Sequence, residues 1–390
     1  MSTVTMKLAI VGCGQIVTHH SIALATLNGF EVVALCDPSS ERRRIIRDLL
    51  PQSLTPVAPP AEFDTLDHLL QHHPSIACSV IFIAVPHDLH ESITRQALAS
   101  GKHVILEKPL APTLESCRAL HAIAKTSSNG MLIVAEQSPY WEEVLLAKKL
   151  LKEGAIGQLV SASSYYYESM RDNVTSGTDA DGGLGWRCSL KRCGGGIVID
   201  GGLHWLRPMR ELCGDIHSVV GVSRRNLEQG LCLEGETLAH ALLKMKQGDN
   251  DDSYLQQPEG SGPLIGTFSA NMMHTSVMAH DSCPYFRLTG TLGELVIAGT
   301  GLNPNGGGGL RIYNEESPNG KDLFSLNRQG GFFLGFQGLW KAIWDILQRQ
   351  DREAALRTVR DAAADVAVAL ALYKSSDTGQ WEMCEVLDPC

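Results

Sequence analysis

The sequence predicts an α/β protein in which a doubly wound parallel sheet comes first and a domain on a large, mostly antiparallel open sheet follows. In roughly the first third, short apolar strand segments alternate with helix-like segments, as expected of parallel strands joined by helices. Beyond this third, strand segments follow one another with few helices between them. We therefore expect one domain at residues 1–135 and a second at 136–390, with the terminal helices packing back on the first domain.

The first domain is delimited by apolar runs that end in turn-forming residues. Strands are expected at Lys7–Val11, Glu31–Asp37, Ser79–Val85, Val104–Leu106 and Met131–Val134. Helices are expected at Ile16–Leu27, after Pro38, at Leu89–Ala99 and at Leu114–Lys125.

The second domain opens with a helix-like segment, Tyr140–Glu153, and continues as strands. These strands are expected at Leu159–Tyr167, His217–Ser223, Thr237–Met245, Leu264–His274, Tyr285–Thr289 and Glu294–Ile297. Two segments interrupt these strands and are interpreted as exposed loops. Gln247–Pro263 is acidic and contains Gly, Ser and Pro, and Gly301–Gly309 is rich in glycine. Helices at Leu339–Gln350 and Ala354–Tyr373 end the domain, which is α/β overall.

Charge and cysteine usage exclude several classes of protein. The 390 residues carry 33 Lys and Arg against 43 Asp and Glu, a net charge of −10 that disfavours nucleic acid and anionic membranes as partners. No run approaches the ~20 apolar residues of a membrane span. The 11 cysteines are scattered without a Cys-x-x-Cys pair, and the apolar run Leu8–Val11 is too short for a signal peptide. We expect a cytoplasmic protein, in which the glycosylation triplet Asn173–Thr175 is a chance match.

The pair Gly12-x-Gly14 follows the first strand and opens a helix, the context that a dinucleotide-binding loop requires. The backbone N–H groups of residues Gly12 to Ile16, including Gln15, can bind a pyrophosphate there without obstruction by side chains. The third glycine of the fingerprint is replaced by Val17, which implies a displaced helix or compensating neighbours. A glycine pair alone is also typical of structural turns. Its position between the first strand and the following helix favours cofactor binding.

Asp37 ends the second strand, where a carboxylate can accept hydrogen bonds from the adenosine ribose. Its charge repels a 2′-phosphate and favours NAD over NADP. If Asp37 turns away, Ser39, Ser40 and Arg42–Arg44 form an alternative phosphate site. The other interpretation of Asp37 is a helix cap.

Glu107, Lys108 and Pro109 follow a strand at its carboxyl end, the edge where open α/β sheets bind ligands. Lys108 can reach the cofactor crevice from there, and the bond before Pro109 is one that can adopt the cis form. A solvated Glu–Lys pair is the alternative. Pro86 and His90 follow the neighbouring strand, in a turn that we expect to line the crevice.

Asp200 and His204 are four residues apart in the segment Gly194–His204 and share a face if it is helical. A neutral imidazole is a suitable base for the hydroxyl proton of an alcohol that loses hydride. Lys108 can stabilise the alkoxide, and Asp200 can orient either partner. A surface histidine is the alternative, although glycines within the helix suggest that something approaches it closely.

Metal and hydrolase chemistry are disfavoured. His87 with His90, or His19 with His20, are possible ligand pairs, but no third and fourth ligand occurs at a recognisable spacing, and we expect no metal. A serine hydrolase would need a Gly-x-Ser-x-Gly elbow, which is missing.

These motifs together resemble the glucose-fructose oxidoreductase, inositol dehydrogenase and MocA-like family (Gfo/Idh/MocA). The matching segments span nearly the whole chain: Ala9–Gly14, Val80–Pro86 with His90, Gly101–Leu110, Gly154–Gly157, Trp186–Arg187, Gly194–His204 and Ser375–Trp381. The Glu-Lys-Pro and Asp-x-Gly-x-His motifs, in this order, are specific in combination.

The resemblance implies an N-terminal Rossmann domain and a C-terminal sheet domain that makes a homodimer or homotetramer. It also implies NAD or NADP as cofactor, with Lys108, Asp200 and His204 at the catalytic positions. Trp186 and Arg187 match family motifs and Tyr140, with Gln137, falls where the family lines its site, so these are candidate substrate contacts. Arg207 departs from the family pattern, since an acidic residue often follows the histidine there.

We therefore expect an NAD(P)-dependent dehydrogenase acting on the CH–OH groups of a sugar, inositol or related polyol. One alternative is an NAD-dependent glycosidase that oxidises its substrate transiently and cleaves it by elimination. Another is a catalytically silent nucleotide-binding sensor. The substrate would be set by the second domain and by the loop Tyr165–Gly185.

Overall fold

The computed structural model describes residues 5–55, 58–72, 76–168, 185–225, 233–246, 253–257, 260–272, 284–298, 307–329, 331–385 and 387. The chain divides into two compact units. Unit 1 consists of Met1–Glu136, Phe336–Ala363 and Leu387–Cys390, and unit 2 of Gln137–Gly335 and Ala364–Val386.

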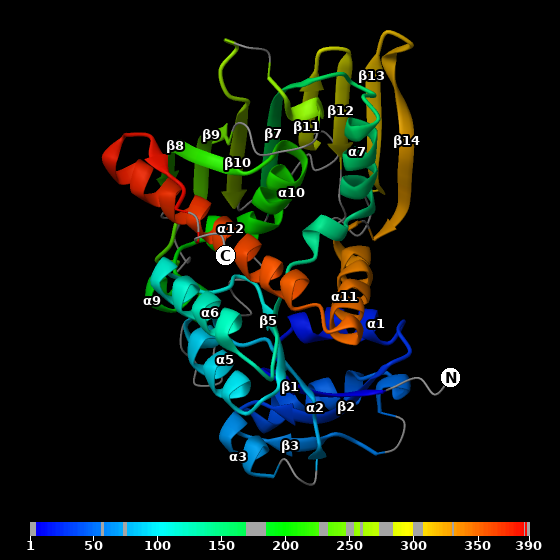
Figure 1. The fold of residues 1–390 in the computed structure, drawn as a ribbon, viewed down its shortest axis with the longest axis vertical. Coiled ribbons are helices and arrows are strands. Elements are labelled where there is room, and N and C mark those ends of the chain that lie inside the picture. The colour runs from blue at the N-terminus through cyan, green and yellow to red at the C-terminus, as the bar shows by residue number, and fades with distance from the viewer. Residues whose placement is uncertain are drawn as a thin grey trace. The chain divides into compact units, whose positions relative to one another are not determined.

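Unit 1 contains, in its described residues, a six-stranded parallel sheet in the order β3-β2-β1-β4-β5-β6 (Figure 1). This is the order of a dinucleotide-binding Rossmann sheet. The central strands are mostly apolar, as in parallel sheets that are covered on both faces; Leu8, Ile10, Val80 and Ile105 are fully buried. The strands are β1 (Met6–Val11), β2 (Phe30–Cys36), β3 (Ala61–Phe63), β4 (Val80–Ile83), β5 (His103–Glu107) and β6 (Leu132–Ala135).

The helices of unit 1 begin in two different ways. Ser39 and Thr113 each accept a hydrogen bond from the backbone N–H three residues on, which caps α2 and α6. The helix α1 has no side-chain cap. The bounds are α1 (Ile16–Leu24), α2 (Ser40–Leu49), α3 (Leu66–Gln71), α5 (His90–Ala99) and α6 (Leu114–Thr126), with short 3₁₀ turns at Gln52–Leu54 and His87–Leu89.

Parts of the last two helices, α11 (Gly331–Arg349) and α12 (Arg352–Thr378), belong to unit 1. Trp344 lies over Gly29, where any side chain would collide with the indole ring. The Thr358 hydroxyl accepts a hydrogen bond of 2.9 Å from the N–H of Val134. These contacts fix both helices to the Rossmann sheet.

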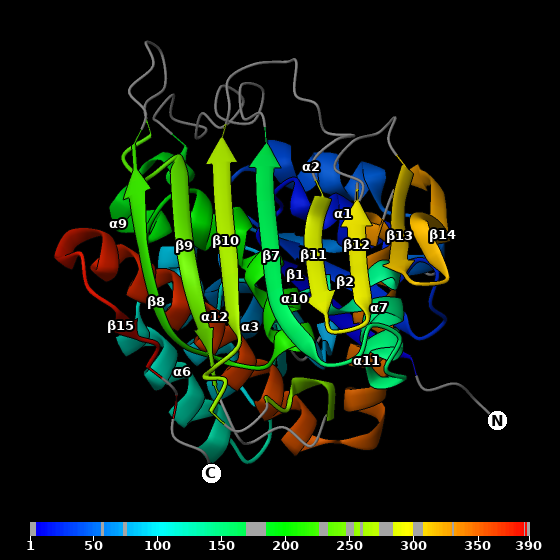
Figure 2. The same cartoon turned by 90° about the horizontal axis from the view of Figure 1, so that it is seen from above.

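Unit 2 contains, where it is described, a nine-stranded sheet in the order β14-β13-β12-β11-β7-β10-β9-β8-β15 (Figure 2). Only β7 and β10 pair in parallel; the other neighbours in this described sheet are antiparallel. The strands are β7 (Leu159–Glu168), β8 (Ile216–Arg224), β9 (Leu238–Met245), β10 (Ile265–Met272), β11 (Pro284–Gly290), β12 (Gly293–Ala298), β13 (Gly307–Asn314), β14 (Ser317–Gln329) and β15 (Glu382–Met383).

One face of this sheet is covered by helices. The helices α7 (Glu142–Lys152) and α10 (Leu203–Cys213) lie on the same side in Figure 2. The core is aromatic: the buried Trp205 of α10 stacks on Tyr166 of β7 with a centroid separation of 4.2 Å and meets Trp141 and Tyr285 edge to face. Aromatic pairs of this kind add to the stability that apolar burial provides.

The predicted fold class is confirmed, and the differences are local. The sequence analysis missed β3, α3 and β15, which have only a few residues each, and also the paired strands β13 and β14. The expectation of a loop at Gly301–Gly309 was wrong at its end, because β13 begins at Gly307. Residues 169–184, with the triplet Asn173–Thr175 and most of the loop Tyr165–Gly185, lie outside the described residues, as do parts of Gln247–Pro263. None of the described helices is long and apolar enough to cross a membrane.

A buried ion cluster joins α10 to the part of α12 that belongs to unit 2. Asp365, whose side chain is 3% exposed, accepts hydrogen bonds of 2.8 Å from Arg207 and 2.6 Å from Arg210. Arg210 also bonds Asp215, which is half exposed. Arg207, the departure from the family pattern, therefore has a structural role.

We expect Asp365→Asn to lower the free energy of unfolding by about 3–5 kcal/mol, because it removes the buried carboxylate that pairs with both Arg207 and Arg210. Asp215→Asn is the matched control and should cost at most about 1 kcal/mol, since its carboxylate is solvated. Urea unfolding of both variants measures the difference. A loss in Asp365→Asn as small as the loss expected for Asp215→Asn would show that the buried cluster does not stabilise unit 2.

Candidate functional site

Gly12 and Gly14 lie where β1 turns into α1, and they serve different purposes. Gly12 has φ +91°, and a Cβ there would lie 2.2 Å from the carbonyl oxygen of Ala84. Glycine is therefore required at position 12 by the fold itself. A Cβ at Gly14 would meet no atom within 4 Å, so the space beside Gly14 is open. That opening is what a ligand needs in order to approach the backbone.

The N-terminus of α1 supports this interpretation. The capping position is held by Gln15, whose side chain makes no capping bond, and the helix begins at Ile16. Uncapped N–H groups together with the helix dipole form a site for an anion. Val17, in place of the usual small residue, is fully buried, so the core of unit 1 accommodates it.

The carboxylate of Asp37 is held between the glycine loop and α2. One oxygen accepts the N–H of Cys13 at 2.8 Å and the other accepts the N–H of Ser39 at 2.9 Å. Only 7% of the residue is exposed. Ser39, and not Asp37, caps α2. Asp37 therefore does not turn away from the site, as the alternative phosphate site would require.

Glu107 ends β5 and is fixed by His20, which is itself bonded to Trp340 within unit 1. Its Oε1 lies 2.5 Å from Nε2 of His20, and Nδ1 of His20 accepts the indole N–H of Trp340 at 2.9 Å. Because an indole nitrogen only donates, Nε2 of His20 carries the proton and donates to Glu107. The other oxygen of Glu107 accepts the N–H of Lys108 at 3.1 Å. This chain of hydrogen bonds positions the backbone at Lys108.

The turn after Lys108 is held from its other side by His90. The Lys108–Pro109 bond is cis. The buried imidazole of His90 has Nδ1 at 2.8 Å from the Pro109 carbonyl and Nε2 at 3.0 Å from the Val85 carbonyl. Burial lowers the pKa of His90, while the two carbonyls favour its protonated form. His90 thus links the end of β4, near Pro86, to the end of β5 through its ring nitrogens.

In unit 2, the structure brings together Trp186, Arg187 and Asp200. The Nε of Arg187 lies 2.9 Å from a carboxylate oxygen of Asp200, and its guanidinium carbon lies 4.3 Å from the Trp186 ring centroid. Asp200 is mostly buried and Arg187 is half exposed. The ion pair holds the carboxylate of Asp200 beside an accessible cation.

Asp200 lies in a π-helical turn, Val198–Gly202, which leads directly into α10. Such turns are rare and occur often at functional sites. The turn is anchored by Glu236, whose carboxylate accepts the N–H groups of Gly196 at 2.7 Å and Val198 at 2.9 Å. Tyr373 donates to the same carboxylate at 2.8 Å. Burial raises the pKa of Glu236.

The sequence analysis missed Glu236 and Tyr373. Nothing in the local sequence marks them, because Glu236 precedes an ordinary strand and Tyr373 lies far along α12.

His204 occupies the first turn of α10 and is 9% exposed. The neighbouring glycines are explained by packing: a Cβ at Gly201 would lie 2.1 Å from the Tyr166 hydroxyl, and one at Gly202 would lie 3.1 Å from the Phe268 ring. The close approach that these glycines suggested is therefore that of β7 and β10. Tyr140 ends a 3₁₀ turn, Ser138–Tyr140, and Gln137 is buried in unit 2.

The proposed histidine pairs are engaged elsewhere. The ring nitrogens of His20 face Glu107 and Trp340, and those of His90 face backbone carbonyls. Within the described part of the chain, no group of three or more His, Cys, Asp or Glu side chains is arranged to hold a metal ion.

Two family models match the chain. The oxidoreductase family with an NAD-binding Rossmann fold matches residues 6–135, and the GFO/IDH/MocA C-terminal domain matches residues 144–296.

Curated relatives match at modest identity. An uncharacterized oxidoreductase of Schizosaccharomyces pombe is 29% identical over 55% of this chain and 54% of its own length, so the match spans about half of that protein. Levoglucosan dehydrogenase of Pseudarthrobacter phenanthrenivorans is 28% identical over 75% of this chain and 73% of its own. A glycosyl hydrolase family 109 protein of Shewanella pealeana is 24% identical over 43% of this chain and 36% of its own.

Solved structures share the fold. Aldose-aldose oxidoreductase from Caulobacter crescentus, complexed with glycerol, superimposes with a TM-score of 0.73 at 19% identity and covers 97% of this chain and 99% of its own. Because both domains match family models and the fold agrees, the chain belongs to the Gfo/Idh/MocA oxidoreductase family.

Proposed function

We propose that the protein is an NAD(P)-dependent oxidoreductase that transfers a hydride between nicotinamide C4 and a carbon bearing a hydroxyl or carbonyl on a sugar, inositol or related polyol. The observation that carries the proposal is the open space beside Gly14 at the uncapped N-terminus of α1. A dinucleotide pyrophosphate fits this cradle. The levoglucosan and aldose specificities in the names of its relatives favour a carbohydrate substrate.

The proposed roles follow from the chemistry of each side chain. His204 removes the hydroxyl proton as hydride leaves the carbon, and returns it in the reverse direction. Lys108 stabilises the developing alkoxide with its positive charge. Asp200, fixed by Arg187, orients the substrate or His204. Tyr140, Trp186 and Arg187 are the proposed substrate contacts, and the bound cofactor supplies the hydride acceptor.

The cofactor contacts are proposed to be of two kinds. Gly14, Gln15 and Ile16 present backbone to the pyrophosphate, whereas Gly12 shapes the turn and donates its N–H to the carbonyl of Cys36 at 2.7 Å. Asp37 faces the adenosine ribose, which favours NAD. Pro86, Glu107 and His90 act through position, since the imidazole of His90 and the carboxylate of Glu107 are bonded within unit 1.

A second candidate is supported by the similarity to a glycosyl hydrolase family 109 protein. In this alternative, a tightly held NAD oxidises the sugar transiently, a glycosidic bond is lost by elimination, and the hydride is returned. The same three residues would serve, but the reaction would release a cleaved sugar without net NADH. A catalytically silent sensor is the third candidate. A melting temperature that changes with neither NAD nor NADP would favour it over the other two.

We also propose a cytoplasmic homo-oligomer that assembles through the open sheet of unit 2. Eight cysteines of the described residues are free and buried, which suits a reducing compartment. Val222 of β8 and Leu242 of β9 are exposed, and so is Val160 of β7. Exposed apolar side chains on adjacent strands suit an interface between copies.

The two glycines of the loop should respond differently to alanine. Gly12→Ala is expected to destabilise the protein by more than about 1 kcal/mol, because of its positive φ and the collision with Ala84. Gly14→Ala should keep the wild-type melting temperature and weaken NAD binding at least about tenfold, since the new methyl group enters the cradle. Calorimetry measures both. Wild-type NAD affinity in Gly14→Ala would contradict the proposal that the pyrophosphate binds beside Gly14.

Replacing Lys108 or His204 with alanine should separate chemistry from binding. Turnover is expected to fall by a factor of about 10² to 10⁴, because the acid/base and the charge that stabilises the alkoxide are lost. NAD affinity should remain nearly unchanged. Steady-state assays on a polyol panel, paired with NAD titrations, test this. Wild-type turnover in both variants would eliminate the assignment.

The oligomer should depend on the exposed apolar residues of the sheet. Light scattering of the wild-type protein is expected to give the mass of a dimer or tetramer. Val222→Arg with Leu242→Arg should shift it toward a monomer, because two charges would be buried at the interface without partners. Ile22→Arg, an exposed residue of α1, is the control and should leave the mass unchanged. An unaltered mass in the double variant would place the interface elsewhere.

A further inference from the structure

A short edge strand brings an acidic residue to the end of β2. The strand β3 pairs with β2 in parallel, with Leu35 opposite Glu62 and Cys36 opposite Phe63. The N–H of Asp37 continues this pairing with a hydrogen bond of 3.1 Å to the carbonyl of Phe63. Glu62 is therefore held close to the position of Asp37.

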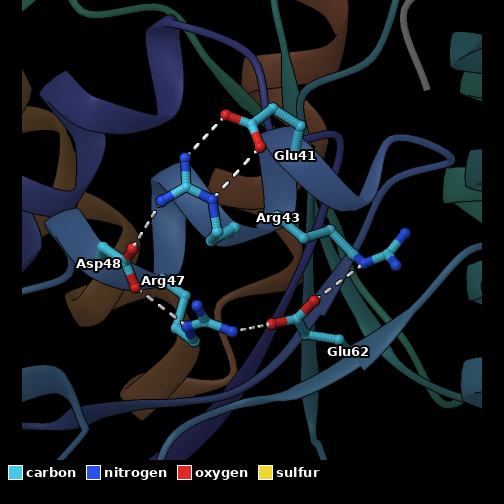
Figure 3. Close-up of polar contacts among 6 residues, drawn as sticks. Glu41, Arg43, Arg47, Asp48 and Glu62 are labelled. Carbon is cyan, nitrogen blue, oxygen red and sulfur yellow. Dashed lines mark hydrogen bonds and ion pairs between the residues drawn. The ribbon is translucent and has the colours of Figure 1, made fainter.

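Glu62 binds two arginines of α2, one with each carboxylate oxygen. Its Oε2 lies 3.2 Å from Nε of Arg43, and its Oε1 lies 2.7 Å from a terminal nitrogen of Arg47 (Figure 3). Arg43 also donates to the backbone carbonyl of Asp37. The Arg43 side chain is only 14% exposed and that of Glu62 is 26% exposed. Solvent screens these pairs less than it screens fully exposed ones.

The remaining arginine of this network is more solvated. Arg44 pairs with Glu41 and Asp48, and all three side chains are more than half exposed. Glu41 is paired with Arg44, and Figure 3 shows Glu41 separate from Glu62. Glu41 and Glu62 thus carry the same charge in the same network, but only Glu62 neutralises the cation that touches Asp37.

The chemistry at this position decides between two cofactors. NADP differs from NAD by a phosphate on the adenosine ribose, which in Rossmann domains lies beyond the second strand and is bound by a nearby arginine. Arg43 lies where it could bind this phosphate. However, the carboxylate of Glu62 is paired with Nε of Arg43 and neutralises the charge of the guanidinium. A phosphate would have to displace Glu62 before Arg43 could bind it as a charge-assisted partner.

We propose that Glu62 is a determinant of cofactor specificity, which excludes NADP by holding Arg43 and Arg47 in ion pairs. This inference rests on the proposed dinucleotide site. Asp37 repels the 2′-phosphate directly, and Glu62 withholds the cations that would compensate for that repulsion.

Calorimetric titration of NAD and NADP into the full-length wild type, Glu62→Gln and Glu41→Gln tests the proposal. We expect Glu62→Gln to tighten NADP binding by about tenfold, the effect of releasing one guanidinium, and to change NAD binding by less than about twofold. Glu41→Gln makes the same change in net charge and should leave both affinities unchanged. The gain in NADP affinity should shrink as salt concentration rises.

Adding Arg43→Gln to Glu62→Gln should abolish the gain. If Glu62→Gln proves too unstable to titrate, Arg47→Gln is the second variant. Without Arg47, the carboxylate of Glu62 pairs only with Arg43 and neutralises it more fully. Arg47→Gln should therefore weaken NADP binding without affecting NAD binding. Equal gains in Glu62→Gln and Glu41→Gln, or no gain in NADP affinity, would overturn the inference. A wild type that binds neither nucleotide would instead refute the proposed function.

Discussion

The buried carboxylate of Asp37 is the interaction on which the candidate cofactor site of unit 1 depends. A charge with 7% exposure must be matched by donors, and here the donors are the N–H groups of Cys13 and Ser39. One belongs to the glycine loop and the other begins α2. The same carboxylate therefore fixes the loop and sets the start of α2, and it lies where we propose that the ribose binds. The backbone carbonyl of Asp37 also accepts a hydrogen bond from Arg43, so the ion pairs of α2 are arranged around Asp37.

Unit 2 also relies on a buried carboxylate that accepts backbone N–H groups. Glu236 is buried at the start of the helical segment that carries Asp200 and His204, and it accepts N–H groups that the helix leaves unpaired. Tyr373 donates to Glu236 and accepts from the N–H of Ile199 at 3.2 Å. The segment is thus anchored by residues outside the proposed catalytic set. Such supporting groups hold catalytic side chains within the narrow range of geometry that catalysis requires.

Sequence patterns predicted most of the fold because its strands are strongly apolar and end in turn residues. Five of the six parallel strands described in unit 1 and six of the nine strands described in unit 2 were located to within a few residues, since burial leaves a clear pattern in them. The short β3 and α3 have too few residues to show a period. The glycines before β13 favoured a loop, and pairing with β12 and β14 overrode that preference.

The candidate site was predictable where its residues follow strand ends, and not where they depend on distant partners. Gly12, Asp37 and Lys108 were found because β1, β2 and β5 end at one edge. The hydrogen bond from Trp340 to His20 joins residues 320 positions apart, and Glu236 bonds Tyr373 over 137 positions. No local pattern encodes such pairs. Gly201 and Gly202 were weighed as functional signals, whereas their neighbours are the rings of Tyr166 and Phe268.

The most direct test of the proposed reaction follows the hydrogen itself. A sugar or polyol turned over by the protein would be prepared with deuterium on the carbon that becomes the carbonyl, and incubated with NAD. Hydride transfer predicts that the deuterium appears at nicotinamide C4 of the NADH that accumulates, in proportion to the carbonyl product. Product formed without deuterated NADH, above all a cleaved sugar with NAD regenerated, would contradict the account.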